Sequence, residues 1–265
     1  MTAMARAVDD LFRQGYACIA LGRHEADVAG TCLREGSGFF ELPADGKLRH
    51  SGADSNYGYR PTGIEYSITP ERPDCNESFT LWAGRLDLIP GAADIEPFTT
   101  ALLAWQAVCS DLTTELLDGC AARFSATAPR FAVASHLQFN NYLPAPAGRE
   151  FLQERHEDGH MVTLLHARGS GLEFEIGGEM RPVVNSPDQV LVLAGSVLTA
   201  LTGGAVAPLY HQVRRTHAGG RRSIMYFVNP ELAEPLFPWT GEQRDLRDYV
   251  RAAPLAFGLP MVEEL

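Results

Sequence analysis

The sequence predicts an α+β protein, mainly β, in which a double-stranded β-helix, or jelly roll, is backed by helices. Between residues 129 and 230, short segments rich in Val, Leu, Phe and Tyr alternate with Gly, Pro, Asn and Asp turns. A long amphipathic helix is predicted ahead of them, and no internal repeat or low-complexity tract is visible. Seven or eight short antiparallel strands behind such a helix are typical of two packed sheets with helical cover.

The first half of the chain is expected to be mixed helix and strand. Residues 4–16 and 24–34 have apolar positions at helical spacing, and residues 17–21 between them suit a strand. From residue 97 to 124, apolar side chains recur every three or four positions, which predicts the longest helix. We expect this helix to pack against a sheet.

The strands of the jelly roll are predicted in the second half, at residues 132–142, 161–166, 172–176, 182–184, 189–193, 209–215 and 222–228. Residues 242–265 have a short helical pattern followed by prolines, so they are expected to lie over the surface or cover the barrel mouth. At 265 residues, the chain is expected to form one domain. It would comprise a helical and mixed region (1–128), the jelly-roll core (129–230) and a C-terminal segment (231–265).

Composition narrows the functional classes. The chain is 45% hydrophobic and 21% charged, and it has no apolar run long enough to cross a bilayer. Its net charge of -11 argues against nucleic acid as a partner. The five cysteines are scattered and odd in number, which favours reduced thiols, and residues 1–23 lack the pattern of a secretory signal. We therefore expect a cytoplasmic protein that acts on a small molecule; the sequence does not indicate its oligomeric state.

Three residues have the types and spacing of a metal site. His156 and Asp158 come just before the predicted strand 161–166, and residues two apart in an extended chain point to the same side. His211 follows 53 residues after Asp158, on another predicted strand. Two imidazoles and one carboxylate leave three positions open on an octahedral ion, which is typical of Fe(II) oxygenases, whereas structural zinc sites are closed and favour thiolates.

A second pair of residues suits a carboxylate ligand. Arg221 and Ser223 follow His211 by ten and twelve residues, on the last predicted strand, where they share one face. A planar guanidinium beside a hydroxyl is suited to two-point binding of a carboxylate. A dicarboxylate could thus chelate the metal at one end and meet Arg221 at the other, and 2-oxoglutarate is the obvious candidate.

Together these motifs resemble the isopenicillin N synthase-like family of Fe(II)/2-oxoglutarate-dependent dioxygenases. Residues 156–165 (HEDGHMVTLL) look like the family's H-T-D-x-G-x-x-T-x-L block, and residues 194–204 are similar to its I-G-D-x-L and L-T-N-G segments. Residues 140–144 (NNYLP) resemble its N-Y-Y-P string, and residues 39–43 with Lys47 and Gly58-Tyr59 look like its N-terminal region. The resemblance covers roughly residues 10–230.

The resemblance implies a cupin-like double-stranded β-helix that binds Fe(II), 2-oxoglutarate and O2. It implies that Tyr142, and with it Asn140, helps to bind the co-substrate. The reaction would release succinate and CO2 and oxidise a C–H bond of a small molecule, most simply by hydroxylation, and a specialised metabolite is the expected substrate. Three alternatives remain: an oxidase of the same fold that uses no 2-oxoglutarate, a zinc hydrolase with the same ligands, and a non-catalytic ligand-binding β domain.

Further residues are expected near the site. If the strands are phased as the ligands require, four side chains should face inward: Asn140, Leu165, Phe227 and Asn229. A loop with Tyr59, Arg60 and Glu65 could reach the mouth, and Arg60 or Arg168 could either pair with a substrate carboxylate or be a solvated arginine. Ordinary surface or hydrogen-bonded roles outside the metal site are expected for His160, His166 and His217.

Overall fold

The computed structural model describes residues 2–52, 56–216 and 220–252. In its first part lie α1 (Ala3–Gln14), β1 (Tyr16–Ala20), α2 (Arg23–Phe40), α3 (Ala44–Leu48), β2 (Gly58–Arg60), β3 (Asn76–Trp82) and α4 (Glu96–Ala122). The second part contains β4 (His136–Tyr142), β5 (Phe151–His156), β6 (Val162–Arg168), β7 (Leu172–Ile176), β8 (Glu179–Pro182), β9 (Gln189–Ala194), α5 (Ser196–Leu201), β10 (His211–Arg214), β11 (Arg222–Val228) and α6 (Arg247–Ala252). Short 3-10 turns occupy Leu86–Leu88, Ala92–Ile95 and Ala132–Ala134.

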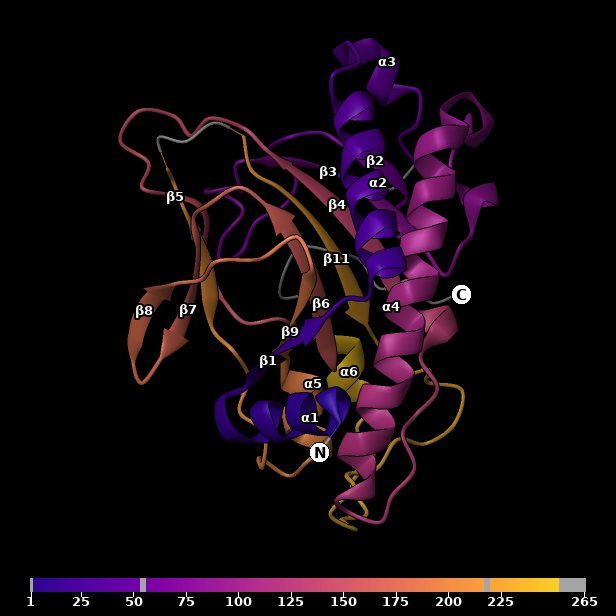
Figure 1. Cartoon of the computed structure of the whole chain (residues 1–265), viewed down its shortest axis with the longest axis vertical. Helices are drawn as coiled ribbons and strands as arrows, with labels where there is room; N and C mark the ends of the chain where they lie inside the picture. Colours follow the sequence, from indigo (N-terminus) through magenta and orange to yellow (C-terminus); the bar gives the residue numbers. More distant parts are fainter. Residues whose placement is uncertain (1, 53–55, 217–219, 253–265) are drawn as a thin grey trace.

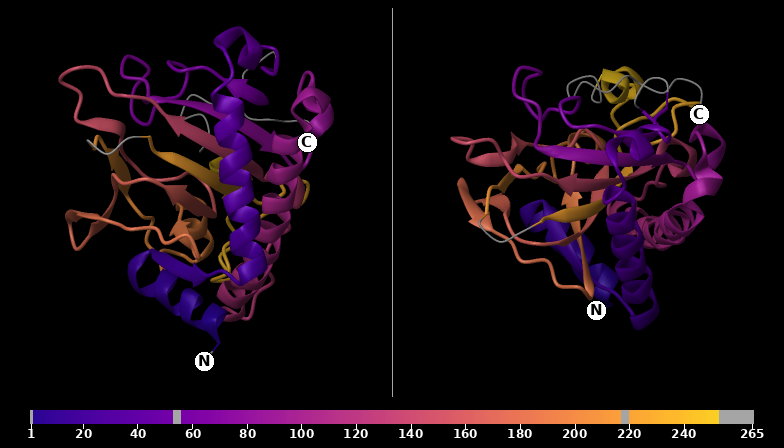
Figure 2. Two further views of the ribbon diagram at one scale, coloured as in Figure 1. Left: turned by 45° about the horizontal axis from the view of Figure 1, so that its top comes forward. Right: turned by 90° about the horizontal axis from the view of Figure 1, so that it is seen from above.

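Two antiparallel sheets form the core of the fold. The major sheet has the strand order β1-β9-β6-β11-β4-β3-β2, and the minor sheet has the order β5-β10-β7-β8. Helices α2 and α4 lie side by side on the outer face of the major sheet, and the minor sheet lies on its other side (Figures 1 and 2). The predicted fold class, a double-stranded β-helix backed by helices, is confirmed.

Helix α4 shows why the helices dock on this sheet. In its apolar stripe, Leu102, Trp105 and Leu116 are fully buried. Helix α2 approaches the sheet closely at Gly36, where an added Cβ would lie 2.2 Å from Cε2 of Phe139. A side chain at this position would therefore overlap the ring, which explains a glycine inside a helix.

The buried apolar residues form two clusters. The larger cluster joins α1, α2 and α4 to the outer face of the major sheet. The smaller lies between the two sheets and includes Leu165, Phe174, Leu191, Val213 and Met225. A cavity remains beside this second cluster, and it contains most of the residues that the sequence singles out.

Several predicted elements differ from the observed ones. Helix α2 extends six residues beyond the predicted residue 34, and a 3-10 turn replaces the start of the predicted strand 132–142. The predicted strand 182–184 is wrong, because the β7–β8 hairpin places β8 at Glu179–Pro182. Elements α3, β2, β3, β5 and α5 are not predicted from the sequence. Helix α6 agrees with the helical pattern after residue 242, and the expected cover of the barrel mouth by residues 253–265 lies outside the described residues.

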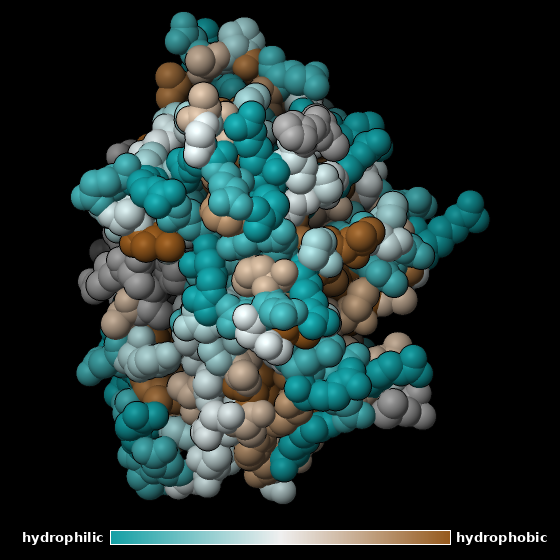
Figure 3. All heavy atoms as spheres, turned by 90° about the vertical axis from the view of Figure 1, so that its left-hand side faces the viewer, coloured by the Kyte–Doolittle hydropathy of each residue, from teal (hydrophilic) through white to brown (hydrophobic). Residues whose placement is uncertain are grey.

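The face carrying the minor sheet is mainly hydrophilic, with small separate hydrophobic patches (Figure 3). None of the helices in the described ranges has the length and apolar character needed to cross a membrane.

Candidate metal and co-substrate site

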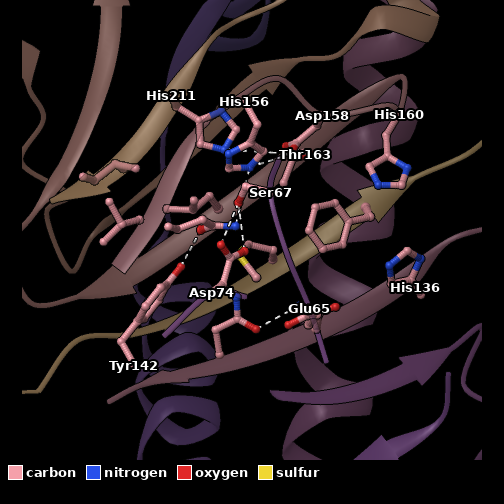
Figure 4. Close-up of a pocket in the computed structure, with 18 of the residues that line it drawn as sticks. Glu65, Ser67, Asp74, His136, Tyr142, His156, Asp158, His160, Thr163 and His211 are labelled. Carbon is pink, nitrogen blue, oxygen red and sulfur yellow. Dashed lines mark hydrogen bonds and ion pairs between the residues drawn. The ribbon is translucent and has the colours of Figure 1, made fainter. Parts of the chain in front are cut away.

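The candidate site is a cavity between the two sheets. Both sheets contribute side chains to its lining, as does the loop that precedes β3. Figure 4 shows His156, Asp158 and His211 close together at one side of the cavity, with Asp74 and Ser67 next to them and Tyr142 further away. The cavity therefore gathers residues that are far apart in the sequence.

Strand pairing brings the two histidines together. His156 ends β5 and His211 begins β10, and the two residues are directly paired in the minor sheet. Asp158 lies two residues beyond the end of β5, outside a strand, and the two side chains converge as expected. Oδ1 of Asp158 is 3.8 Å from Nε2 of His156 and 3.9 Å from Nε2 of His211. All three donor atoms lie within 4.8 Å of one another, a spacing that fits one metal ion.

Backbone carbonyls fix the orientation of both imidazoles. Nδ1 of His156 lies 2.6 Å from the carbonyl oxygen of Glu154, and Nδ1 of His211 lies 3.3 Å from that of Leu209. Because a carbonyl only accepts, each Nδ1 carries the hydrogen and each Nε2 presents its lone pair to the site. Asp158 is held in turn by Thr163, whose hydroxyl donates to Oδ2 at 2.5 Å.

Electrostatics favour the protonation states that bind metal. Burial, with the facing His211 as a smaller cause, lowers the pKa of His156 to about 4. Burial by itself would raise the pKa of Asp158, but His211, His156, His160 and the Thr163 hydrogen bond hold that pKa below its usual value. The site thus favours a neutral His156 and an ionised carboxylate at neutral pH, which is the form in which these side chains bind a metal ion.

Arg221 offers unsatisfied donors to the same cavity. It is only 5% exposed, and Nη1 donates to the carbonyl oxygen of Gly169 at 3.2 Å. Nε and Nη2 are buried and have no hydrogen-bond partner among the described residues. Burial lowers the pKa of this guanidinium. A buried guanidinium with two free N–H groups fits an incoming carboxylate, so the residues present fit both an iron ion and a dicarboxylate.

Tyr142, Asn140 and Ser223 lie near this guanidinium. The Arg221 guanidinium lies 5.5 Å from the centre of the Tyr142 ring, and the Tyr142 hydroxyl donates to Oε1 of Gln153 at 2.9 Å. Asn140 lines the cavity and accepts a hydrogen bond from Gln138. Ser223 is fully buried, outside the cavity lining, and its hydroxyl lies 3.5 Å from Sδ of Met225. Tyr142 and Asn140 thus line the cavity directly, and the expected contact of Ser223 with the co-substrate stays a prediction.

The other predicted pocket residues divide into two groups. The inward orientation of Leu165, Phe227 and Asn229 is confirmed, because all three line the cavity, and Glu65 does so too. Tyr59 does not, since it is buried elsewhere and donates to Glu77. Neither arginine suits the expected substrate contact: Arg60 is 2% exposed and paired with Glu65, and the exposed Arg168 lines a separate surface pocket.

Of the three other histidines considered from the sequence, two lie in the described residues, and both are hydrogen-bonded as expected. Nδ1 of His160 lies 2.7 Å from Oδ1 of Asn229, and Nδ1 of His166 lies 2.8 Å from the carbonyl oxygen of Gln189. His160 also lines the cavity, which the sequence does not indicate. His217 lies outside the described residues.

Several lining residues have no sequence signal. They are Ser67, Asp74, Trp82, His136, Gln138 and Gln153. Most of them come from β3, β4 and the loop before β3, where buried polar residues hide the strand pattern. Trp82 and His136 are directly paired across the β3–β4 ladder, and their rings stack with centroids 4.2 Å apart. Only the alternation of residues along β4 could have suggested this side of the cavity.

Comparison with known proteins agrees with this geometry. Residues 134–230 match the model of the 2OG-Fe(II) oxygenase superfamily, a stretch that contains all three triad residues and Arg221. A full-length protein from Neurospora crassa, solved in complex with alpha-KG, superposes with a TM-score of 0.79 at 19% identity, over 96% of this chain and 90% of that one. JOX2 in complex with 2OG, Fe and JA also gives a TM-score of 0.79, at 15% identity over 97% and 81% of the two chains.

A third structure has the same fold. The complex of dioxygenase for auxin oxidation 1 from Arabidopsis thaliana with 2-oxoglutarate gives a TM-score of 0.68 at 19% identity, over 89% of this chain and 90% of that one. At such identities these likenesses show the fold alone, and the family model matches the core of the chain, residues 134–230. Because the matched model describes the whole superfamily, the isopenicillin N synthase-like affiliation stays a prediction. The core of the chain, residues 134–230, matches the 2OG-Fe(II) oxygenase superfamily, and the fold and the triad agree with an Fe(II)- and 2-oxoglutarate-dependent dioxygenase.

Proposed function

We propose that His156, Asp158 and His211 bind Fe(II), that Arg221 anchors 2-oxoglutarate, and that the enzyme hydroxylates a C–H bond of a small molecule. One observation carries this proposal. Two Nε2 lone pairs and one carboxylate oxygen converge on a single point, in the same cavity as a buried guanidinium with two free N–H groups. When bound, Fe(II) and 2-oxoglutarate supply the oxidising chemistry, in which O2 is consumed and succinate and CO2 are released.

The residues of the chain bind and orient the metal ion and the co-substrate. The carbonyl oxygens of Glu154 and Leu209 keep the two imidazoles in the tautomer that presents Nε2 to the metal. Arg221 would take the distal carboxylate of the co-substrate through its free Nε and Nη2, which fixes the direction in which the molecule lies. In the proposed complex, Tyr142 adds a hydroxyl beside that carboxylate, and Asn140 adds an amide.

Apolar side chains limit water around the reacting groups. Leu165, Leu172, Val213 and Met225 line the cavity and are buried in the smaller apolar cluster. A dry surrounding strengthens the ionic contacts of the site and protects a reactive oxidant from side reactions. Their position supports an oxidation that takes place inside the cavity.

A small substrate is supported by the cavity and by relatives. The N. crassa protein has been solved with thymine, and JOX2 with JA, both of them small molecules. We infer a substrate of similar size, and we place a specialised metabolite first among the candidates. We also infer that residues 1–265 act as one oxygenase domain, because one apolar cluster joins the N-terminal helices to the catalytic core. The cytoplasmic location stays a prediction.

Co-substrate turnover tests the proposed function. Purified enzyme supplied with Fe(II), 2-oxoglutarate and O2 should form succinate even without a substrate, at a slow uncoupled rate. His211→Ala should abolish this formation, because two ligands alone would not hold the ion in a catalytic geometry. Succinate formed at the same rate by the variant would refute the metal assignment. O2 consumption that needs iron but no 2-oxoglutarate would favour an oxidase of the same fold.

A further inference from the structure

We propose that the substrate of this enzyme carries a protonated amine, which forms an ion pair with Asp74. This inference deepens the proposed function and rests on it, because it assumes that iron and 2-oxoglutarate occupy the triad and Arg221. No sequence motif marks Asp74, which lies in the segment between β2 and β3 and directs its carboxylate into the cavity close to the triad (Figure 4).

Asp74 is a buried carboxylate, and Ser67 is its single side-chain hydrogen-bond donor among the described residues. Asp74 is 4% exposed, and the Ser67 hydroxyl lies 3.0 Å from Oδ1 and 2.8 Å from Oδ2. One hydroxyl hydrogen can serve only one of these oxygens at a time, so the carboxylate keeps free acceptor capacity. Within the described residues, no Lys, Arg or His nitrogen lies within 4.0 Å of it. A buried charge without an ionic partner is unfavourable, and a ligand cation would remove that penalty.

The nearest charges do not compensate Asp74. His156 faces it but serves as a neutral metal ligand in the proposed complex, and Arg149 exerts a weaker attraction than either His156 or the Ser67 hydrogen bond. Glu65 adds a further repulsion. The net result is that burial raises the pKa of Asp74 to about 6.

With Fe(II) and 2-oxoglutarate bound, the negative charge of Asp74 is not balanced by a positive charge of the cavity lining. Fe(II) carries two positive charges, which Asp158 and one carboxylate of 2-oxoglutarate balance. The second carboxylate of 2-oxoglutarate is balanced by Arg221. The Glu65 carboxylate, also in the cavity lining, is balanced by its ion pair with Arg60. Among the described residues that line the cavity, one negative charge therefore remains, on Asp74, and a substrate with one positive charge balances it.

The walls of the cavity also suit an organic cation. Trp82, His136 and Phe227 line it as a connected group of rings, with centroids 4.2 Å apart between Trp82 and His136 and 4.9 Å apart between His136 and Phe227. The faces of aromatic rings attract ammonium groups and cover apolar carbon. An anionic substrate would meet the unbalanced carboxylate instead. The cavity thus favours an amine attached to a compact apolar or aromatic body.

Three probes of one shape and different charge test this inference. Benzylamine, benzyl alcohol and benzoate would each be titrated into the anaerobic Fe(II)–2-oxoglutarate enzyme, with binding followed by calorimetry and by the visible band of the iron complex. Benzylamine should bind wild type more tightly than the alcohol, and benzoate most weakly. Asp74→Asn should weaken benzylamine by about 30-fold or more and leave benzyl alcohol unchanged, since the variant loses only the charge.

Two further variants separate the effect of the Asp74 charge from other effects of substitution. Asp74→Glu keeps the charge and should retain a preference for benzylamine over the alcohol. Asp111→Asn removes an exposed carboxylate on α4 and should bind all three probes as wild type does. Equal binding of the amine and the alcohol by wild type, including no binding of either, would overturn the inference, as would an Asp74→Asn variant with unchanged benzylamine affinity.

The visible 2-oxoglutarate band and the amine preference together distinguish failure of the inference from failure of the proposed function. A normal 2-oxoglutarate band without amine preference would overturn only the role of Asp74. Amine preference that depends on Asp74, in a protein that never forms the band, would overturn the proposed co-substrate site and leave the role of Asp74 standing.

Discussion

Substitution of Arg221 by alanine should weaken 2-oxoglutarate binding strongly without weakening the fold. The side chain is 5% exposed, and its Nε and Nη2 have no partner among the described residues. Loss of one partner from a buried, hydrogen-bonded charge pair costs about 2–5 kcal/mol. At about 1.4 kcal/mol for each tenfold change, the dissociation constant of 2-oxoglutarate should rise by about 30-fold to several thousand-fold.

The stability of the unliganded protein separates an anchor from a structural arginine. Two unsatisfied buried donors are unfavourable by about 1–3 kcal/mol each, so their removal offsets much of the packing that alanine loses. Arg221→Ala should therefore melt close to wild type. Arg221→Lys should bind 2-oxoglutarate with intermediate affinity, because it keeps the charge but lacks the planar fork.

Anaerobic calorimetry of the Mn(II)-loaded protein measures this affinity without turnover. Arg168→Ala, which removes an exposed arginine at the end of β6, is the matched control and should bind 2-oxoglutarate as wild type does. Two results would refute the reasoning: an unchanged dissociation constant in Arg221→Ala, or a large drop in its melting temperature with affinity retained.

Three further predictions concern stability. Gly36→Ala should destabilise the fold by about 1–3 kcal/mol, because the new Cβ would overlap Phe139; an unchanged thermal midpoint would contradict this packing. Lys47→Met should destabilise by about 3–5 kcal/mol in urea unfolding, because it leaves Glu77 as a buried charge without its ion pair; a change below about 1 kcal/mol would show the pair to be dispensable. Asp74→Asn should stabilise the metal-free protein at pH 7.5 by up to about 3 kcal/mol, since the folded pKa of about 6 lies above the ordinary 3.8 and burial of the ionised form is unfavourable. That advantage should shrink as the pH falls from 6 to 4, and an advantage independent of pH would contradict the assigned pKa.

The sequence predicts those parts of the fold that carry an apolar stripe or a short apolar run. The stripe of α4 and the runs of β6, β9 and β11 are apolar enough to be recognised without neighbours. Strand β3 is not, because it begins with buried Asn76, Glu77 and Ser78. Glu77 is tolerated there only because Lys47, Tyr59 and Asn141 reach it from other elements. Such tertiary compensation has no local signal.

In the site, too, some residues have a local sequence signal and others do not. His156, Asp158, His211 and Arg221 follow a spacing that the jelly roll fixes, so residue type and position suffice to single them out. The substrate side of the cavity is built differently. Asp74 comes from an irregular segment, and its proximity to the triad depends on how that segment folds over the sheets, which no periodicity in the sequence describes.

The central claim is that the triad and Arg221 form one site for Fe(II) and 2-oxoglutarate. Anaerobic titration of the Fe(II)-loaded protein with 2-oxoglutarate, followed by visible absorption, tests it most directly. We expect a weak charge-transfer band that saturates with 2-oxoglutarate in wild type, requires a higher 2-oxoglutarate concentration in Arg221→Ala and is absent in Asp158→Ala. A wild-type protein that demonstrably holds iron yet forms no band, or an Asp158→Ala variant that forms the same band, would contradict it.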